Sequence, residues 1–444
     1  MKYLRLRWIF KGLFSLLLTT ITVSLSQVSS AQVQNYYVSS TGNDGNDGSQ
    51  ARPWKTLSRA NVALSLGAAG TVVHIAPCQT NNPCYTGTIN LSRSGTASQR
   101  ITWQSDTPQG AKVDGVINVS GSYVTVKDFD ITDTSTADDG ITTLYNSSPP
   151  VYGQFVQLLG NYIHDVQFST SPGCSGNSGI LVAAGSHDFV VDSNIILRAG
   201  HWGGCSSTGG SGAHGLYIAG YHGTVTNNQV SNVAGYGIHL YHNPCQNVIS
   251  NNTIFHNYTG GIQMAGPADG LSPCSSTGND YSSVNNNLVV RNAFGATQGG
   301  TPHAHYGIIF GTSGLGSHNK AFNNFLAANI TDGGGQMNSI FVSGGVPAPA
   351  QGGNISQSST AGIFVNYQDD GSGDYHLVTN SPAAAAGAAS SSTVCASSPG
   401  LSSCVPNMDI AENVRSQDLS IGAYEMITSS SAPNAPTGLT ATVQ

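Results

Sequence analysis

The sequence carries little charge. Only 8% of its 444 residues are Asp, Glu, Lys or Arg, and 15 Lys plus Arg stand against 22 Asp plus Glu, a formal net charge of −7. Nucleic-acid binding needs a basic surface, and no basic tract is present, so we expect no nucleic-acid partner. An acidic polymer would have to be bound by a few well-placed cations.

Glycine is abundant where strong helix formers would be needed. The 55 Gly residues and the low charge argue against an α-helical solenoid. Instead a short Gly-apolar phrase returns at positions 140, 179, 215, 237, 261 and 307, at spacings of 39, 36, 22, 24 and 46 residues. An Asn-x-apolar phrase recurs with the same repeat, starting at Asn161, Asn194, Asn228, Asn252, Asn287 and Asn324.

These phrases predict the turns of a parallel β-helix. A repeat of about two dozen residues suits one such turn, whose strands stack on those of the neighbouring turns at roughly 4.8 Å. The recurring Asn can adopt a left-handed backbone and hydrogen-bond along the stack. We therefore predict an all-β, right-handed single-stranded parallel β-helix over residues 32–426, with the longer spacings carrying loops.

The two ends of the chain lack the Gly and Asn phrases and differ from the repeats in composition. A basic start, an apolar run over residues 12–25 and small residues near Ala31 predict a signal peptide at residues 1–31, so we expect a secreted or periplasmic protein without a membrane span in its mature form. Residues 427–444 form a Ser-rich linker and a fragment that resembles the start of a fibronectin type III module.

Export makes the eight cysteines candidates for disulfides. Cys174 and Cys205 precede the Gly phrase of successive turns, and Cys245 and Cys274 follow it, so each pair could link stacked turns. We expect Cys78–Cys84 and Cys395–Cys404 to close small local loops.

The start of the mature chain resembles a known family. The strand-like 36–39, the Gly-Asn-Asp turn at 42–48 and the Pro-Trp-Lys-Thr segment at 53–56 are similar to secreted bacterial right-handed parallel β-helix (pectate-lyase-like) proteins. The resemblance implies a capping helix at 57–66, and we expect first strands at 72–75, 101–103 and 124–131. Phrases at 374–377 and 421–425 resemble the family's closing segments, which we interpret as a cap.

Aligning the repeats predicts which side chains share a surface. The second residue after each Gly should point outward, because its neighbours on either side are apolar; these residues are Thr142, Leu181, Tyr217, His239, Gln263 and Ile309. A second column is the fourth residue after each marked Asn: Asp165, Arg198, Asn232, His256, Arg291 and Ala328. Loops add His201, Trp202, His214, His303 and His305.

The family resemblance implies a polysaccharide substrate on this outer face and, in many members, cleavage of uronate chains by β-elimination. That reaction needs a base, for which an imidazole of His214 or His239 is suited. It also needs a proton donor, for which Tyr217 is suited, although Tyr217 could instead be the base if nearby cations lower its pKa from about 10. A cation, Arg198 or Arg291, is needed beside the sugar carboxylate. We assign substrate binding to His201, Trp202, His256, Gln263, Arg291, His303 and His305.

Other interpretations of the same residues stay open. Stacked His and Tyr side chains also occur on sheet faces for packing alone, and the arginines could simply pair with Asp165 or Asp192. A glycoside hydrolase would use Asp138, Asp139 and Asp165 as acids, and a non-catalytic glycan- or surface-binding protein would need none of them. We predict no cofactor and no calcium site, weigh a transition-metal site at His214, His303 and His305 as a minor alternative, and expect a monomer.

Overall fold

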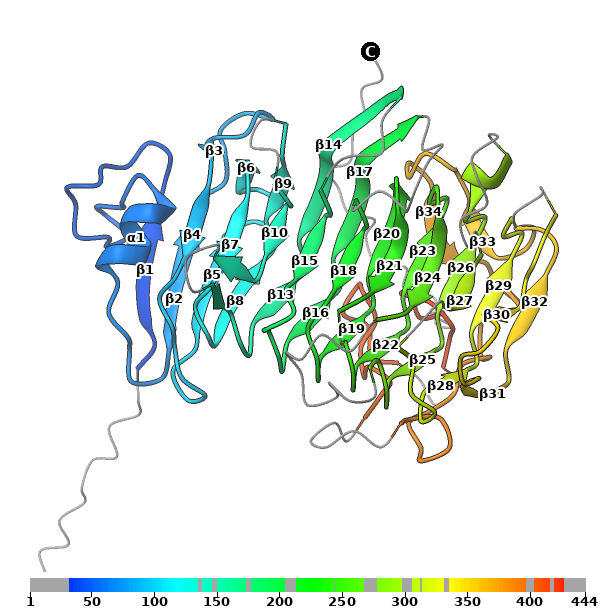
Figure 1. The fold of residues 1–444 in the computed structure, drawn as a ribbon. Helices are drawn as coiled ribbons and strands as arrows, with labels where there is room; N and C mark the ends of the chain where they lie inside the picture. Colours follow the sequence, from blue (N-terminus) through cyan, green and yellow to red (C-terminus); the bar gives the residue numbers. More distant parts are fainter. Residues whose placement is uncertain are drawn as a thin grey trace, which may run out of the picture.

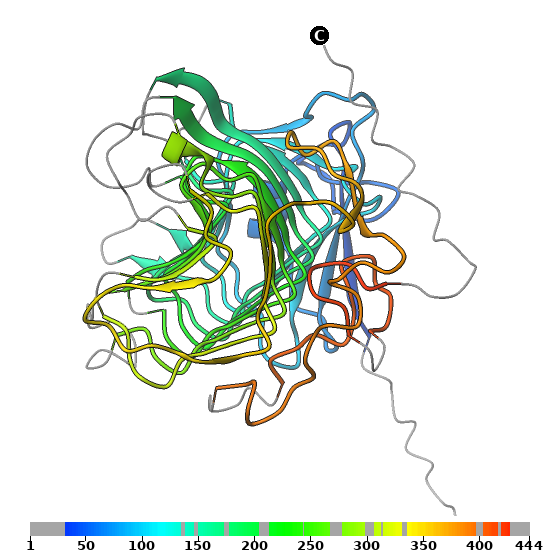
Figure 2. The same cartoon turned by 90° about the vertical axis from the view of Figure 1, so that its right-hand side faces the viewer.

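The chain winds into a long right-handed coil of short parallel strands (Figure 1). The computed structural model describes residues 32–134, 138–145, 150–172, 177–203, 213–242, 244–266, 278–297, 306–311, 314–330, 335–396, 403–415 and 419–426. The segments expected to be a signal peptide and a C-terminal linker lie outside these residues. A typical turn contributes one strand to each of three sheets, as the view along the stack shows (Figure 2).

The eleven-stranded sheet begins each turn and stacks its strands in chain order. Its strands are β1 (Gln34–Val38), β2 (Thr71–Ile75), β5 (Ile101–Ser105), β8 (Val124–Lys127), β13 (Gln157–Leu159), β16 (Val190–Asp192), β19 (Thr224–Thr226), β22 (Val248–Ser250), β25 (Ser283–Asn285), β28 (Lys320–Phe322) and β31 (Ala350–Gly352).

The ten-stranded sheet contains the strands that follow the marked Asn residues. They are β3 (Tyr85–Thr86), β6 (Lys112–Asp114), β9 (Asp130–Thr132), β14 (Tyr162–Pro172), β17 (Ile195–Gly203), β20 (Gln229–Val233), β23 (Thr253–Phe255), β26 (Leu288–Val290), β29 (Phe325–Ala327) and β32 (Ile355–Gln357). Strands β14 and β17 extend well beyond their neighbours (Figure 1).

The nine-stranded sheet contains the strands of the Gly phrase. They are β4 (Ile89–Leu91), β7 (Ile117–Val119), β10 (Ile141–Thr142), β15 (Ile180–Val182), β18 (Leu216–Ile218), β21 (Tyr236–Leu240), β24 (Gly260–Met264), β27 (Ile308–Phe310) and β30 (Ile340–Val342). The remaining elements are the hairpin β11 (Leu144–Tyr145) with β12 (Val151–Tyr152), the hairpin β33 (Phe364–Asn366) with β34 (Asp374–Leu377), helix α1 (Leu57–Ala63) and the 3-10 turn η1 (Phe294–Thr297).

Left-handed residues make the corners between sheets. The residue just before each marked Asn has a positive φ, for example Ser193 (59°), Asn227 (55°) and Asn251 (56°). We expected the marked Asn itself to take this conformation; instead the corner lies one residue earlier. This shift leaves the marked Asn facing inward. The segment 124–131, expected as one strand, is likewise split into β8 and β9 by a corner at Asp128 (φ 64°).

The marked asparagines form a buried hydrogen-bonded ladder along the stack. The side-chain Nδ2 of each donates to Oδ1 of the Asn in the next turn at 2.9 to 3.1 Å, through Asn161, Asn194, Asn228, Asn252, Asn287, Asn324 and Asn354. The first six of these residues are fully buried. From Asn194 onward, each Oδ1 also accepts the backbone N–H of the preceding ladder Asn, as in Asn228 to Asn252 at 2.9 Å. The ladder satisfies polar groups that a dry interior would otherwise leave unpaired.

The first turns and their cap match expectation. Helix α1 begins after Thr56, whose hydroxyl accepts the backbone N–H of Arg59 at 3.0 Å. Leu57 and Ala60 are buried against the first turns, as a cap over the open end of a β-helix requires. The helix is shorter than the expected 57–66 and ends at Ala63.

The C-terminal segment, residues 363–426, does not cap the far end as we expected. It packs Ile363, Tyr375 and Ile421 against Phe255, Leu288 and Phe325 on the outer face of the ten-stranded sheet. Its backbone carbonyls accept the side-chain N–H groups of the corner residues Asn251, Asn286 and Asn323, and Arg415 donates to Asn227 at 2.7 Å. This segment therefore lies beside the stack and covers one flank.

Two of the expected disulfides are confirmed. Cys78–Cys84 and Cys395–Cys404 close local loops with Cα separations of 5.6 and 5.5 Å. Cys245 is also disulfide-bonded. The expected pairs Cys174–Cys205 and Cys245–Cys274 each involve cysteines outside the described residues.

Replacing Asn252 by Ala tests the ladder. The change removes the bonds that Oδ1 of Asn252 accepts from the backbone N–H and Nδ2 of Asn228, and those that its Nδ2 donates to the Val225 carbonyl and to Oδ1 of Asn287, so the buried N–H of Asn228 loses its partner. Buried groups left unpaired cost about 1–3 kcal/mol each, so we expect the free energy of unfolding to fall by at least about 2 kcal/mol in urea titration. The exposed Asn82→Ala should change it by less than about 0.5 kcal/mol. Equal effects of the two changes would contradict a structural role for the ladder.

Candidate functional site

The outward column on the nine-stranded sheet is observed in the expected register. Parallel pairing joins the column residues in sequence order: Thr142 to Leu181, Leu181 to Tyr217, Tyr217 to His239, His239 to Gln263 and Gln263 to Ile309. Because strand neighbours lie at roughly 4.8 Å, each side chain is within reach of the next.

Only the middle of this column is open to solvent. Thr142 and Ile309 are 5% and 0% exposed, whereas Leu181, Tyr217, His239 and Gln263 are partly exposed. We call these four side chains the exposed window. It spans three strand spacings, roughly 14 Å at ~4.8 Å per strand.

His214 lies beneath the exposed window and is held from several sides. It precedes Gly215 at the start of β18, where its backbone N–H donates to Ser178 Oγ at 3.2 Å and its carbonyl accepts the N–H of Gly179 at 3.0 Å. The side chain is 4% exposed. Its Nδ1 accepts the backbone N–H of Tyr236 at 3.0 Å, and its Nε2 lies 2.7 Å from Nδ1 of His239.

Aromatic rings surround His239. The ring of Tyr217 is nearly parallel to that of His239, with centroids 5.2 Å apart and an interplanar angle of 7°. Tyr236 and Tyr241 each have their centroid 5.5 Å from His239, and His214 is 4.1 Å away in an edge-on arrangement. The structure thus brings three of the four residues predicted to be catalytic, His214, Tyr217 and His239, into one cluster.

Both imidazoles of this cluster are neutral at ordinary pH. Burial, and then the charge of His239, lower the pKa of His214 well below its usual value. Burial, followed by the charge of His242, lowers the pKa of His239 to about 3. Desolvation disfavours the charged form of a histidine when no carboxylate compensates for it.

The predicted catalytic Arg198 lies on another wall. It is a left-handed corner residue of β17 (φ 61°), and its Nε and Nη2 bind Oδ1 and Oδ2 of Asp165 at 2.5 and 2.7 Å. The guanidinium is 5.9 Å from the ring of Phe168. Arg198 therefore extends over the ten-stranded sheet, on which Phe168 and Asp165 lie, and no contact joins it to the His214 cluster within the described residues.

Asp165 belongs to a wider ion-pair network. His164 contacts Asp165 through Nδ1 at 2.6 Å and Asp130 through Nε2 at 2.9 Å, and Lys112 lies 3.3 Å from Asp130. Burial alone would raise the pKa of Asp165, but hydrogen bonds from Arg198 and His164 hold it far below its usual range. Asp165 is thus kept ionised and fully engaged.

The two other predicted binding residues of the corner column face the C-terminal segment. Arg291 places Nε and Nη2 each 3.0 Å from the carboxylate of Asp369. His256 bonds Asn232 at 2.9 Å and stacks on Phe294 at 4.3 Å. Neither contacts the exposed window in the described part of the chain.

The predicted loop residues are only partly visible. His201 is described at the end of β17, where it pairs with Ser169 in β14. The side chain of Trp202, and all of His303 and His305, lie outside the described residues. The structure therefore assigns no contact to Trp202, His303 or His305.

Sequence reasoning missed Tyr236 and Tyr241. Tyr236 immediately precedes Gly237, just as His214 precedes Gly215, so the position before each Gly carried the signal. Gly235 is also required here, because a Cβ at this position would lie 2.3 Å from Nδ1 of His214. The bond between the Tyr236 amide and His214 depends on that close approach.

Asp139 precedes Gly140 just as His214 precedes Gly215, and it lies two turns before His214 along the coil. Its carboxylate accepts the backbone N–H of Ser178 at 2.6 Å. Burial raises the pKa of Asp139 to about 7, and the nearby charges of Asp138 and Asp133 add to the effect against the lowering by Ser178. Asp139 can therefore exchange a proton near neutral pH.

The comparisons with known proteins agree with this architecture. Residues 78–270 match the protein family described as "Right handed beta helix region". The chain is a right-handed parallel β-helix protein. No curated protein matches the sequence.

Solved structures share the fold at low identity. A pectate lyase, Pel9A, is 15% identical with a TM-score of 0.51, over 89% of this chain and 97% of its own. A rhamnogalacturonan lyase is 15% identical with a TM-score of 0.41, over 76% and 91%. The structure of XylC with xylose is 11% identical with a TM-score of 0.42, over 89% of this chain and 98% of its own. At these identities only the fold of this β-helix protein is supported.

The described residues of the β-helix hold no cluster of three or more His, Cys, Asp or Glu side chains suited to a metal ion. Among the same residues, no helix is both long and apolar enough to cross a bilayer.

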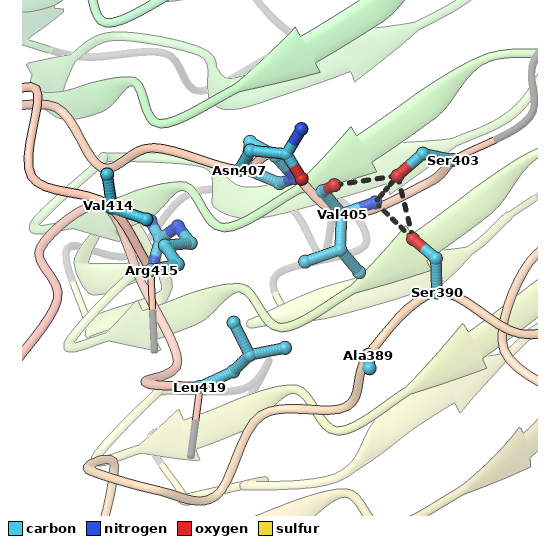
Figure 3. A pocket seen from close by; sticks show the side chains of 9 residues that line it. Ala389, Ser390, Ser403, Val405, Asn407, Val414, Arg415 and Leu419 are labelled. Carbon is cyan, nitrogen blue, oxygen red and sulfur yellow. Dashed lines mark hydrogen bonds between the residues drawn. The ribbon is translucent and has the colours of Figure 1, made fainter. Parts of the chain in front are cut away.

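A separate hollow of about 460 Å³ lies within the C-terminal segment, lined by Ser390, Ser403, Val405 and Arg415 among others (Figure 3). Ser390, Ser403 and Arg415 in its lining are engaged with one another or with neighbouring segments. Ser390 and Ser403 hydroxyls are 2.8 Å apart, and Arg415 pairs with Glu425 at 3.1 Å. These groups hold the C-terminal segment together. We therefore place the candidate site at the exposed window.

The ion-pair network around His164 predicts a pH-dependent stability. Burial lowers the pKa of His164, but its bonds to Asp130 and Asp165 outweigh burial and raise it to about 9. A raised folded-state pKa contributes stability below the unfolded pKa of about 6.5, and this contribution disappears as pH rises to about 9. In urea titrations, His164→Gln should therefore be less stable than wild type at pH 6, with a difference that shrinks toward pH 9.5. A difference independent of pH would contradict the assignment.

Proposed function

We propose that the protein degrades a uronate-containing polysaccharide as a lyase, with the exposed window as its active site. The observation that carries the proposal is the placement of Tyr217, His239 and Gln263 on consecutive strands, beside buried His214. A phenol, an imidazole and a carboxamide within two strand spacings can transfer a proton and hydrogen-bond a carboxylate. A pectate lyase has the same fold, which is compatible with this proposal.

In this scheme Tyr217 moves the proton. As phenolate, Tyr217 would remove the proton on the carbon next to the sugar carboxylate, and the phenol so formed would protonate the departing glycosidic oxygen. The carbon–oxygen bond breaks, a carbon–carbon double bond forms, and no water is consumed. Gln263, one strand beyond His239, would hydrogen-bond the sugar carboxylate in place of Arg198 or Arg291, which are engaged in ion pairs with Asp165 and Asp369.

The protein's setting is part of the proposal. We infer that it acts outside the cytoplasm, as a monomer and without a cofactor. The disulfides Cys78–Cys84 and Cys395–Cys404 support an oxidising compartment. The partner would be the polysaccharide itself.

Tyr217→Phe tests the reaction and the residue together. Purified protein is incubated with a panel of uronate-containing and neutral polysaccharides, and unsaturated uronate is followed by ultraviolet absorbance. We expect wild type to form this product and Tyr217→Phe to lose at least about 10²-fold in kcat, the scale of proton-transfer catalysis. Tyr123→Phe, a change at a stacked corner tyrosine far along the coil, should keep wild-type activity. Full activity of Tyr217→Phe would remove Tyr217 from the mechanism.

A second candidate function follows from Asp139. A carboxyl with a pKa of about 7 is suited to protonate a glycosidic oxygen, as a glycoside hydrolase requires. Asp165, another of the three acids predicted for a hydrolase, is held in its pair with Arg198. In the same assay, reducing ends without ultraviolet absorbance, abolished by Asp139→Asn, would replace the lyase by a hydrolase. Binding to a polysaccharide without any product would favour a non-catalytic protein.

A further inference from the structure

The hydrogen bonds around His214 and His239 have a fixed direction. The backbone N–H of Tyr236 can only donate, so Nδ1 of His214, 3.0 Å away, must be an acceptor and carry no proton. The proton of neutral His214 therefore sits on Nε2. That N–H points at Nδ1 of His239 at 2.7 Å, so Nδ1 of His239 is also an acceptor. The proton of neutral His239 is left on its Nε2.

We propose that His214 is a positioning residue that fixes the tautomer of His239, so that His239 offers an Nε2–H donor to the substrate carboxylate and does not act as a base. This inference deepens the proposed function and rests on it for the identity of the bound group. Among the described residues the His239 ring makes no hydrogen bond besides that to His214, and its side chain is partly exposed. Its Nε2–H is therefore available to a ligand.

The alternative roles of His239 conflict with the same bonds. A base would need an unprotonated Nε2, which moves the proton to Nδ1, where it would face the N–H of His214. A second proton, which would make His239 an imidazolium, would also have to sit on Nδ1 and face the N–H of His214. Within the described part of the chain, the titratable side chains around His239 are His214, Tyr217, Tyr236, Tyr241 and His242. No carboxylate is among them to favour an imidazolium.

The neutral donor has a defined place in the elimination. Negative charge builds up on the sugar carboxylate as its neighbouring carbon loses a proton, and a preorganised N–H strengthens its bond to that charge. A neutral imidazole cannot release its Nε2 proton without becoming an imidazolate, so the transferred proton stays with Tyr217. Because the phenol of tyrosine ordinarily ionises near pH 10, turnover should rise with pH above neutrality.

The test is the tautomer itself, read by nitrogen-15 NMR on histidine-labelled full-length protein. The His239 signals are assigned by their loss in His239→Gln. We expect His239 in wild type to show a protonated Nε2 and an unprotonated Nδ1, unchanged from about pH 4 to pH 9. An Nδ1–H tautomer, or titration of His239 near pH 6.5, would overturn the proposal whether or not any polysaccharide is cleaved.

Variants at position 214 connect the tautomer to activity. In His214→Leu the donor to His239 is lost, so His239 should populate both tautomers, and kcat should fall about 10²-fold, the scale of losing one preorganised donor. His214→Gln keeps an N–H donor at the place of Nε2. It should therefore restore part of the preference for the Nε2–H tautomer of His239 and part of kcat. A wild-type tautomer pattern in His214→Leu would overturn the positioning role, and the wild-type spectrum remains decisive if that variant does not fold. If the tautomer is confirmed but the protein yields no unsaturated product, the proposed lyase function is contradicted and the positioning role of His214 is not.

Discussion

The buried asparagine ladder is the interaction on which the other features of the molecule depend. Each marked Asn bonds the next through both its side chain and its backbone, which fixes how every turn sits on its neighbour. Since side chains alternate along a strand, a slip of one residue would exchange the core and surface faces. The ladder excludes that slip. The same register that buries Ile238 and Leu240 therefore places His239 outward, beside Tyr217.

The few charges of this chain are distributed unevenly over its surface. Arg198 and Arg291, at the corners of the ten-stranded sheet, are each neutralised by a carboxylate, Asp165 and Asp369. The cluster of His214, Tyr217 and His239 instead combines two neutral imidazoles with a tyrosine side chain. The arginines are held by their ion pairs, whereas His214 and His239 are held by hydrogen bonds and ring packing. A site of this kind depends on orientation more than on net charge.

The sequence predicted the repeat, the facing of the strands and the capping helix, because each depends on local pattern. The pairing of Tyr217 with His239 followed from counting residues after Gly215 and Gly237. The position of Arg198 did not follow, because a left-handed corner turns its side chain toward Asp165 and away from the nine-stranded sheet. His214 was correctly selected, but its bond to the Tyr236 amide depends on the approach that Gly235 permits. Long-range placement of residues 363–426 has no signal in the repeat itself.

The flank-covering segment has a consequence for how the protein is made. Asn227, Asn251, Asn286 and Asn323 belong to four successive turns, and all of them find partners in the C-terminal segment, which is synthesised after those turns. Until then, Phe255, Leu288 and Phe325 lack their cover. Solenoids ordinarily gain stability turn by turn through neighbours alone. Here one segment contacts several turns at once, so those turns lack part of their packing until residues 363–426 have been synthesised.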